Sequence, residues 1–286
     1  MIELSVAPVK RADEEKFGNA LQRLSEEDPT LVVRIDDQTD ETILAGMGEL
    51  HLEVAVDRLH REFGVEVQVG APAVAYCETI TRAIKVEGRL VKQSGGHGQF
   101  AVAIVEFEPL PAGSGFEFES KIYGGAIPRQ YIPSVEKGIR RSLSRGPLAK
   151  QPIVDIKATL VDGKYHDVDS SDRAFETAGA YALREGVLRG SPVVLEPVMG
   201  VEVVTPTDYT GDIIGDSGSR AATVKGIEPR GTGTQVITAD VPLARMFGYA
   251  TTIRSLTQGR ATFAMQFSHY QHVSAEVQRA LCSDAA

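Results

Sequence analysis

The sequence predicts an α+β protein of three domains, in which two small βαββαβ domains lie on either side of a different middle domain. The same order of strand, helix, strand, strand, helix, strand is predicted near both ends of the 286 residues. A composition of 42% hydrophobic and 24% charged residues is typical of globular domains of this kind. We place the three domains at residues 1–76, 77–197 and 198–286.

The first domain shows its order most clearly. An alternating run at residues 2–6 predicts a strand, and Asp13 is placed to cap a helix whose inner face is Phe17, Ala20, Leu21 and Leu24. Pro29 ends that helix. Strands are expected at 31–35 and 42–45, a second helix carries Leu52, Val56, Leu59 and Phe63 on one face, and alternation resumes at 65–69.

The third domain repeats this order without obvious sequence identity to the first. Strands are predicted at 198–204, 224–228, 235–241 and 261–267. Helices are predicted at 206–215, entered at Pro206, and at 244–256.

The middle domain differs because three strands, at 84–91, 100–107 and 116–122, precede its first helix. That helix is predicted from Pro128 to about residue 145, and an apolar strand at 153–160 follows. A polar loop at 162–170 then leads to a helix that begins at Ser171 and ends before Pro192.

Two loops of the middle domain indicate a contact surface. Residues 93–99 read Gln-Ser-Gly-Gly-His-Gly-Gln, with no apolar side chain that could fill a core. Glycine allows close backbone approach, while glutamine, serine and histidine supply hydrogen-bond donors and acceptors. The loop at 162–170 is similarly polar. These residues alone leave a phosphate, a nucleic acid and a protein open as the partner.

Charge and motifs exclude several classes. The net charge of −9 belongs to the first domain, while residues 77–197 carry +1 and residues 198–286 carry −1, so the later domains can still gather arginines on one face. Neither GxxxxGK[ST] nor NKxD occurs, so we expect no GTP hydrolysis and no cofactor in this chain.

Cys77 and Cys282 are isolated, which argues against a disulfide or a zinc site. No apolar run or leader is long enough for a membrane segment, and we expect a cytoplasmic protein.

Short matches to catalytic and binding motifs remain as alternatives. Ser217 lies in a Gly-Asp-Ser-Gly-Ser segment like that of trypsin-like proteases, and residues 212–215 fit the DxxG pattern of GTPases. Residues 95–98 fit the GxxG of RNA-binding KH domains, although the flanking strands disfavour that fold. His166, with Asp167 and Asp169, could hold a metal, act in acid/base catalysis, cap the Ser171 helix or form a contact surface.

Taken in order, nine stretches of the chain resemble the third, fourth and fifth domains of translation elongation factor G. They lie at 46–53, 76–80, 95–99, 109–118, 131–133, 165–171, 195–197, 228–231 and 246–251. The resemblance implies ferredoxin-like outer domains and a middle domain of ribosomal-protein-like α+β type with a left-handed βαβ crossover. It also implies a fragment of a translational GTPase, whose missing N-terminal domain would hold GTP and magnesium.

The resemblance further implies that the two polar loops form a tip that contacts RNA where tRNA and mRNA move through the decoding region of the ribosome. The residues expected at this contact are Gln93, Ser94, Gly95, Gly96, His97, Gly98, Gln99, Lys164, Tyr165, His166, Asp167 and Ser170. No catalytic or metal-binding residue is expected, and the partners implied are rRNA, tRNA with mRNA, and the GTPase domain.

Three departures from the family pattern indicate a divergent paralogue. Cys77 stands where the family usually has arginine, and His97 occupies a position that is often basic. Residues 217–222 replace a turn that normally contains asparagine and consecutive arginines. A role in ribosome recycling or rescue is therefore the alternative to translocation.

Overall fold

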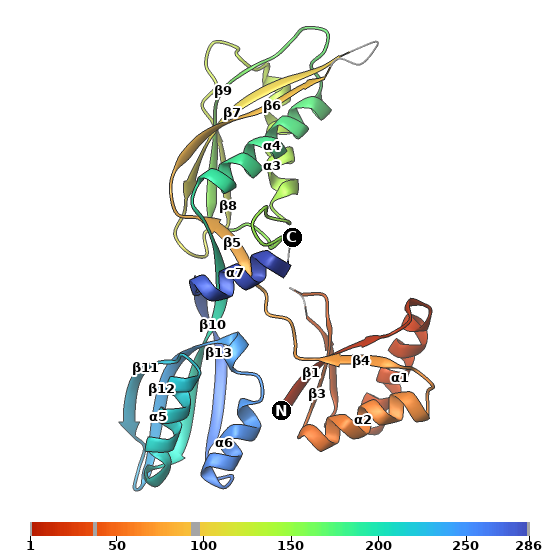
Figure 1. Cartoon of the computed structure of the whole chain (residues 1–286), viewed down its shortest axis with the longest axis vertical. Helices are drawn as coiled ribbons and strands as arrows, with labels where there is room; N and C mark the ends of the chain where they lie inside the picture. The colour runs from red at the N-terminus through yellow and green to blue at the C-terminus, as the bar shows by residue number, and fades with distance from the viewer. Residues whose placement is uncertain (1, 37–38, 93–97, 285–286) are drawn as a thin grey trace. The chain divides into compact units, whose positions relative to one another are not determined.

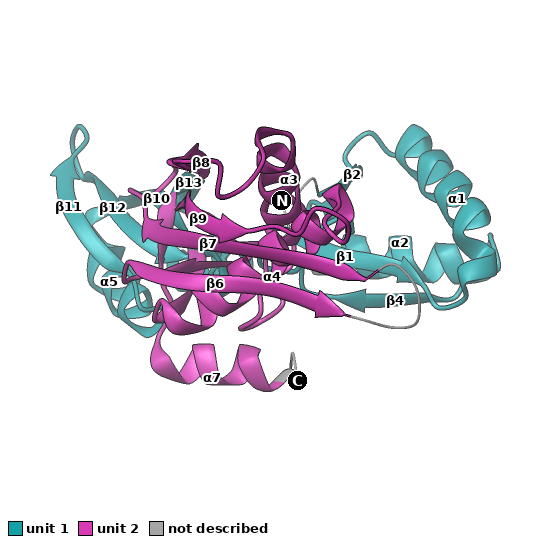
Figure 2. Ribbon diagram, turned by 90° about the horizontal axis from the view of Figure 1, so that it is seen from above, with its two compact units in different colours: residues 1–75, 197–268 teal, residues 76–196, 269–286 magenta. Residues whose placement is uncertain are grey.

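The computed structural model of the chain describes residues 2–36, 39–92 and 98–284, and it contains two compact units (Figure 2). Unit 1 comprises Met1–Ala75 and Pro197–Ser268, and unit 2 comprises Tyr76–Glu196 and His269–Ala286. Helices and three mixed or antiparallel sheets in the described part confirm the predicted α+β class. The described residues include no helix that is both long and apolar enough to cross a membrane.

The first part of unit 1 has the predicted βαββαβ order. Its sheet has the strand order β2-β3-β1-β4 and is antiparallel throughout. A core that includes Phe17, Leu24, Leu52 and Leu59 joins both helices to this sheet. Its elements are β1 (Ile2–Pro8), α1 (Glu14–Glu27), β2 (Val32–Ile35), β3 (Thr42–Gly46), α2 (Glu49–Arg61) and β4 (Val67–Gly70).

The second part of unit 1 repeats that order around a separate core that includes Val203, Ile213, Ile237 and Ile253. Its sheet has the order β11-β12-β10-β13. Its elements are β10 (Pro192–Pro206), α5 (Thr210–Ser219), β11 (Thr223–Pro229), β12 (Thr234–Pro242), α6 (Tyr249–Thr257) and β13 (Thr262–His272).

Unit 2 is built on a sheet of order β6-β7-β9-β8, with α3 and α4 covering one face (Figure 1). Strands β8 and β9 are parallel and α3 connects them, whereas the other neighbours are antiparallel. This is a βαβ crossover unit, and its predicted left hand stays a prediction. The elements are β6 (Ile84–Lys92), β7 (Gln99–Pro109), β8 (Phe116–Ser120), α3 (Ile132–Ser142), β9 (Ile156–Lys164) and α4 (Asp172–Arg189).

Glycines allow α4 to lie unusually close to its neighbours in unit 2. A Cβ atom on Gly88 of β6 would lie 2.0 Å from the carbonyl oxygen of Ala178 in α4. Where α3 and α4 cross, a Cβ on Gly138 would lie 2.0 Å from the carbonyl oxygen of Glu176. These contacts let backbone pack on backbone, so α4 is held rigidly over the sheet whose end carries the predicted tip.

The boundaries correct several predictions. Residues 162–164, predicted as loop, are the end of β9, because they pair with Ile104, Ala103 and Val102 of β7. Pro128 and Pro206 adopt extended conformations just before short 3-10 turns, so each precedes its helix instead of starting it. Asp13 occupies the N-cap position of α1, but its side chain makes no capping hydrogen bond.

Two elements were not predicted at all, and both belong to unit 2 where they meet β10. Strand β5 (Cys77–Ile80) pairs with Pro192–Leu195, the first residues of β10. Helix α7 (Ala275–Asp284) packs through Val277 and Leu281 against a small core around Val194. By their contacts, residues 269–286 are grouped with unit 2.

Candidate nucleic-acid interface

Both predicted polar loops leave the sheet of unit 2 at the same end. Lys92 at the end of β6 pairs with Gln99 at the start of β7, and Lys164 at the end of β9 pairs with Val102 of β7 (Figure 1). Of the first predicted loop, Gln93, Ser94, Gly95, Gly96 and His97 lie outside the described residues. The described candidates are Gly98, Gln99, Lys164, Tyr165, His166, Asp167 and Ser170, and the sheet brings all of them to one end.

Asp169 and Ser170 join the second loop to the start of β7. The Asp169 side chain accepts a hydrogen bond from the backbone N–H of Gly98 at 2.9 Å, and its carbonyl oxygen accepts one from the N–H of Phe100 at 2.9 Å. The Ser170 hydroxyl donates to the carbonyl oxygen of Phe100 at 2.7 Å. Residues 169 and 170 of the second loop thus satisfy backbone groups of Gly98 and Phe100, and they join the second loop to the described end of the first.

His166 stabilises the second loop from within. Its backbone N–H donates to the Ser170 hydroxyl oxygen at 2.9 Å, and its ring Nδ1 accepts from the N–H groups of Val168 and Asp169 at 3.3 Å. With Nδ1 as an acceptor, the neutral ring carries its proton on Nε2. The side chain is 54% exposed, so that Nε2–H is available to an acceptor outside the protein. The Ser171 helix is capped by Ser171 itself, whose hydroxyl oxygen accepts from the N–H of Ala174.

Side chains of α3, α4 and the turn before α3 support the second loop. The Tyr131 hydroxyl donates to the carbonyl oxygen of Ser170 at 3.3 Å, and its ring stacks on Phe175 of α4 with 4.8 Å between ring centroids. Ser134 of α3 donates to Asp172 at 2.7 Å. Tyr131 was not predicted as a supporting residue. The role of Asp169 in holding Gly98 was not predicted either, because pairing across 71 positions leaves no local signal.

The exposed side of this feature is polar and includes an unpaired cation. Lys164, Tyr165, His166 and Asp167 are exposed, and within the described residues Lys164 has no ion pair or side-chain hydrogen bond. A lysine ammonium, a tyrosine hydroxyl and an imidazole N–H are donors that suit phosphate and ribose oxygens. Among the described residues, no three histidine, cysteine or acidic side chains are grouped so that they could hold a metal ion.

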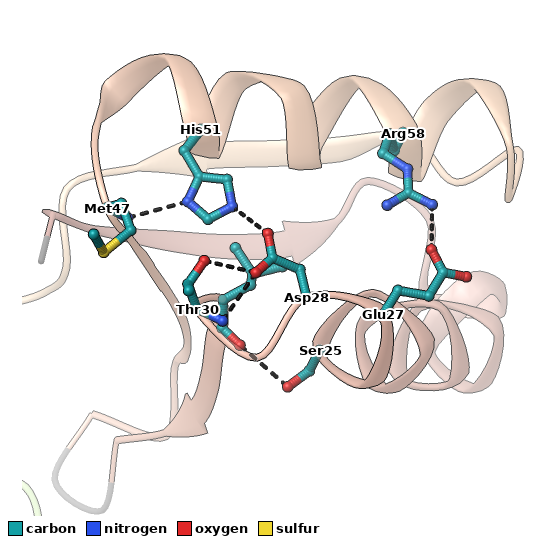
Figure 3. A network of polar contacts seen from close by, with 8 residues as sticks. Ser25, Glu27, Asp28, Thr30, Met47, His51 and Arg58 are labelled. Atoms are coloured by element: carbon teal, nitrogen blue, oxygen red, sulfur yellow. Dashed lines mark hydrogen bonds and ion pairs between the residues drawn. The ribbon is translucent and has the colours of Figure 1, made fainter.

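Unit 1 contains a second polar network, between the end of α1 and the start of α2 (Figure 3). His51 accepts from the N–H of Met47 at Nδ1, 3.1 Å, and its Nε2 lies 2.8 Å from the Asp28 carboxylate. Asp28 also accepts from the side chain and the backbone N–H of Thr30. These hydrogen bonds, those from Thr30 first and that from His51 next, hold the pKa of Asp28 below its usual value. The network ties the two helices together.

Ser217 and Arg220 of the divergent segment face inward in unit 1. The Ser217 hydroxyl is buried and donates to the carbonyl oxygen of Ile213 at 2.7 Å, which is a helix-internal bond and leaves no free nucleophile. Arg220 donates to Asp216 at 2.8 Å, to the carbonyl oxygen of Arg245 and to Thr252, and it lies over the Tyr249 ring. Its guanidinium is thus occupied inside the protein.

Comparison with known families matches three consecutive domain models to the chain. Residues 1–71 match the model described as Elongation Factor G, domain III, residues 72–191 match Elongation factor G, domain IV, and residues 193–281 match Elongation factor G C-terminus. Among solved structures, a crystal structure of a protein from Thermus thermophilus is similar, with a TM-score of 0.85 and 37% sequence identity. The match covers 99% of this chain and 42% of that chain, so the chain spans less than half of that relative.

Proposed function

Because the chain belongs to the elongation factor G family, in which it carries domain III, domain IV and the C-terminal domain, we propose that it is the ribosome-binding module of a translational GTPase. In this proposal the joined loops at the end of the unit 2 sheet enter the decoding region and contact the RNA there. The chain itself performs no chemistry. GTP and magnesium belong to a separate N-terminal GTPase domain, and the whole factor works in the cytoplasm.

The observation that carries the proposal is the set of bonds by which Asp169 and Ser170 of the second loop hold Gly98 and Phe100. A contact with RNA in a crowded site requires donors that are already in place, since ordering a loop on binding costs affinity. Here Tyr131 and the Ser171 cap hold the second loop on two helices, and the second loop holds Gly98. The described part of the tip is therefore preorganised.

The chemistry of the exposed side fits recognition of RNA shape. Lys164 provides a charge for a phosphate, and the Nε2–H of His166 and the Tyr165 hydroxyl provide donors for phosphate or ribose oxygens. None of these groups reads a base edge by a fixed bidentate geometry. We accordingly propose that the tip contacts whichever tRNA and mRNA occupy the site, as a factor acting on all codons must, and opposes their backward movement.

The direct test is chemical footprinting of ribosomal RNA with and without the 286-residue chain. We expect protection of nucleotides in the decoding region of the small subunit. Replacing Lys164→Gln together with His166→Ala should remove that protection and lower the slope of log affinity against log salt by about 1, as loss of one phosphate contact does. Lys85→Gln, which neutralises an exposed lysine paired with Glu106 at the other end of β6, is the matched control. Unchanged decoding-region protection in the tip variant would refute the assignment.

The translocation step needs the GTPase domain and is tested separately. In a factor that joins this chain to such a domain, His97→Ala with His166→Ala should slow translocation while leaving ribosome-stimulated GTP hydrolysis largely intact. The reason is that the tip acts after binding, on the tRNA, and not on the nucleotide. Equal slowing of both rates would instead assign these residues to ribosome binding as a whole.

Ribosome recycling is the second candidate function, and the inward position of Arg220 favours it. The guanidinium is 15% exposed and is bonded to Asp216, so it cannot serve as a phosphate contact on large-subunit RNA without breaking that network. A factor with a changed fifth-domain contact fits a specialised paralogue. Subunit splitting in the presence of recycling factor, without measurable translocation, is the result expected of this alternative.

A further inference from the structure

A hollow of about 520 Å³ lies in unit 2 between the loop after α3 and the outer face of α4. Arg145, Lys150 and Arg184 line it, together with Tyr181, and no acidic side chain takes part in the lining. Ile153 and Leu183, both buried, form part of its floor. It belongs neither to the joined loops described above nor to the networks of unit 1.

The three cations of this hollow are unpaired. Within the described part of the chain, none of the side chains of Arg145, Lys150 and Arg184 has an ion pair or a hydrogen bond. Among the arginines of α3 and α4, Arg140 pairs with Glu136 and Arg189 with Glu185, whereas Arg141 and Arg173 have no ion pair within the described residues. Three uncompensated cations around a concave surface concentrate positive potential there.

Helix stabilisation does not account for this arrangement. Cations are favourable near the C-terminal end of a helix, and the last turn of α3 already contains Arg140 and Arg141. Arg184 lies on α4 just before its last turn, and Lys150 lies beyond α3 altogether. The helix dipole therefore does not explain why these cations line one hollow.

The loop that presents Lys150 is held in place by a buried carboxylate. Glu78 of β5 is fully buried and accepts hydrogen bonds from the backbone N–H groups of Leu148, Ala149 and Gln151 at 2.7 to 3.1 Å. The N–H of Gly146 closes the loop on the carbonyl oxygen of Gln151 at 2.7 Å. Lys150, at the turn of this loop, has a φ of 58°. A loop with its own internal anchor can keep a cation in position without a ligand.

Tyr181 gives the hollow an aromatic wall. Its side chain is 45% exposed although it lies on α4, whose inner face is fully buried. An exposed ring beside apolar floor residues offers a surface on which a base can stack, and stacking is tolerant of base identity. The cations of this hollow suit a phosphate and the Tyr181 ring suits a base, so the hollow can contact both ends of a nucleotide.

We propose that this hollow binds a nucleoside phosphate, with Arg145, Lys150 and Arg184 around the phosphate and Tyr181 against the base. Two sources share this chemistry: a free mononucleotide, and one residue of a single-stranded RNA. The proposal does not depend on the ribosomal function, because it rests on the residues of the hollow alone. It adds a ligand site that is separate from the tip.

The test is titration calorimetry of the whole 286-residue chain at low salt with three probes: adenosine 5′-monophosphate, inorganic phosphate and a ten-nucleotide oligouridylate. Tyr181→Leu should weaken binding of the nucleotide probes about 5-fold or more, as loss of a stacking platform does. Arg145→Ala combined with Arg184→Ala should weaken the binding of both nucleotide probes further. It should also reduce the slope of log affinity against log salt for the oligouridylate. Arg189→Ala on α4 is the control, and it should leave the monophosphate affinity within about 2-fold.

Every outcome of the titrations either supports the proposal or refutes it. Binding of the monophosphate that the hollow variants weaken supports a free nucleotide, and binding of the oligonucleotide alone with the same sensitivity supports an RNA strand. The proposal fails if neither nucleotide probe binds, if binding ignores the hollow variants, or if inorganic phosphate binds as tightly as the monophosphate and Tyr181→Leu changes nothing. Circular dichroism melting of each variant checks that it is folded. Since ribosome footprinting reports on the tip, failure of either proposal leaves the other standing.

Discussion

Asp169 accepts a hydrogen bond from the backbone N–H of Gly98 at 2.9 Å, across 71 positions of the sequence. A Cβ atom at position 98 would lie 3.0 Å from that carboxylate, so glycine also suits the approach. The bond makes the position of Gly98, next to the start of β7, depend on a residue of the second loop. Gly98 and the second loop should consequently respond together when Asp169 is changed.

Asp169→Ala is predicted to loosen Gly98 and the second loop without unfolding unit 2. The substitution leaves the N–H of Gly98 without its acceptor and removes the carboxylate beside His166, and a lost bond of this kind costs about 1–3 kcal/mol. Amide hydrogen exchange should accelerate at Gly98 and at residues 166–169, while exchange in α4 stays unchanged. Asp167→Ala, an exposed neighbour in the same loop, is the control. Equal acceleration in both variants would argue against the specific role of Asp169.

Gly88→Ala is predicted to destabilise unit 2, because the added methyl group would collide with the backbone of α4. The new Cβ would lie 2.0 Å from the Ala178 oxygen and 2.7 Å from the Ala182 nitrogen, and a helix backbone can relieve this only by moving away. Overpacking of this kind costs about 1–3 kcal/mol or more. Denaturant unfolding followed by circular dichroism measures it. Gly200→Ala, where the nearest atom is 3.8 Å from the new Cβ, should be far milder, and an equally large loss there would contradict the explanation.

The Asp28 network predicts a specific acid sensitivity of unit 1. Bonds from Thr30 and His51 depress the pKa of Asp28 in the folded protein. A depressed folded pKa contributes stability that is present above the unfolded pKa of the carboxyl and is lost as the pH falls through the folded value. The midpoint of unfolding should therefore drop on acidification below about pH 4.

Asp28→Asn tests this prediction. The variant should be less stable than the parent at neutral pH, and the difference between the two should shrink as the pH falls below about 4. Thermal melting at a series of pH values, followed by circular dichroism, gives both curves. A difference that stayed constant over that range would show that the network does not depend on the charge of Asp28.

The local patterns of this sequence were enough to predict most elements but not their long-range partners. Phe17, Leu24, Leu52 and Leu59 recur at helical spacing because each helix buries one face, and such periodicity is visible in one chain. Strand β5 was missed because Cys77–Ile80 are all buried and show no alternation, and its partner β10 lies more than a hundred positions away.

The candidate site was likewise predictable only in part: its exposed loops could be predicted, but the contacts that hold them could not. Glycine and polar composition predicted which loops face outward, since a loop without apolar residues has no core to join. The bonds that Asp169 and Tyr131 make in this region could not be predicted. Their partners, Gly98 and Ser170, lie 71 and 39 positions away, and no local pattern indicates them. Arg145, Lys150, Arg184 and Tyr181 meet only through the packing of α3 and the loop after it on α4, and no local pattern at any of them indicates the other three.

Arg220→Ala is predicted to separate α5 from α6 and to destabilise the second part of unit 1. The Arg220 side chain is only 15% exposed, and it connects Asp216 of α5 to the carbonyl oxygen of Arg245 and to Thr252 of α6 while it covers the Tyr249 ring. Truncation leaves the mostly buried Asp216 carboxylate without its cation, which typically costs about 3–5 kcal/mol.

Arg220→Lys should recover only a small part of this loss, because a lysine ammonium cannot reproduce three directed bonds and the contact with the ring. Arg245→Ala is the control, since its side chain has no partner within the described residues and Arg220 bonds only to its backbone carbonyl oxygen. Denaturant unfolding of the three variants gives the order. If Arg220→Lys were as stable as the parent, the internal bonds of the guanidinium would not be needed for stability. Its inward position would then no longer favour a changed fifth-domain contact.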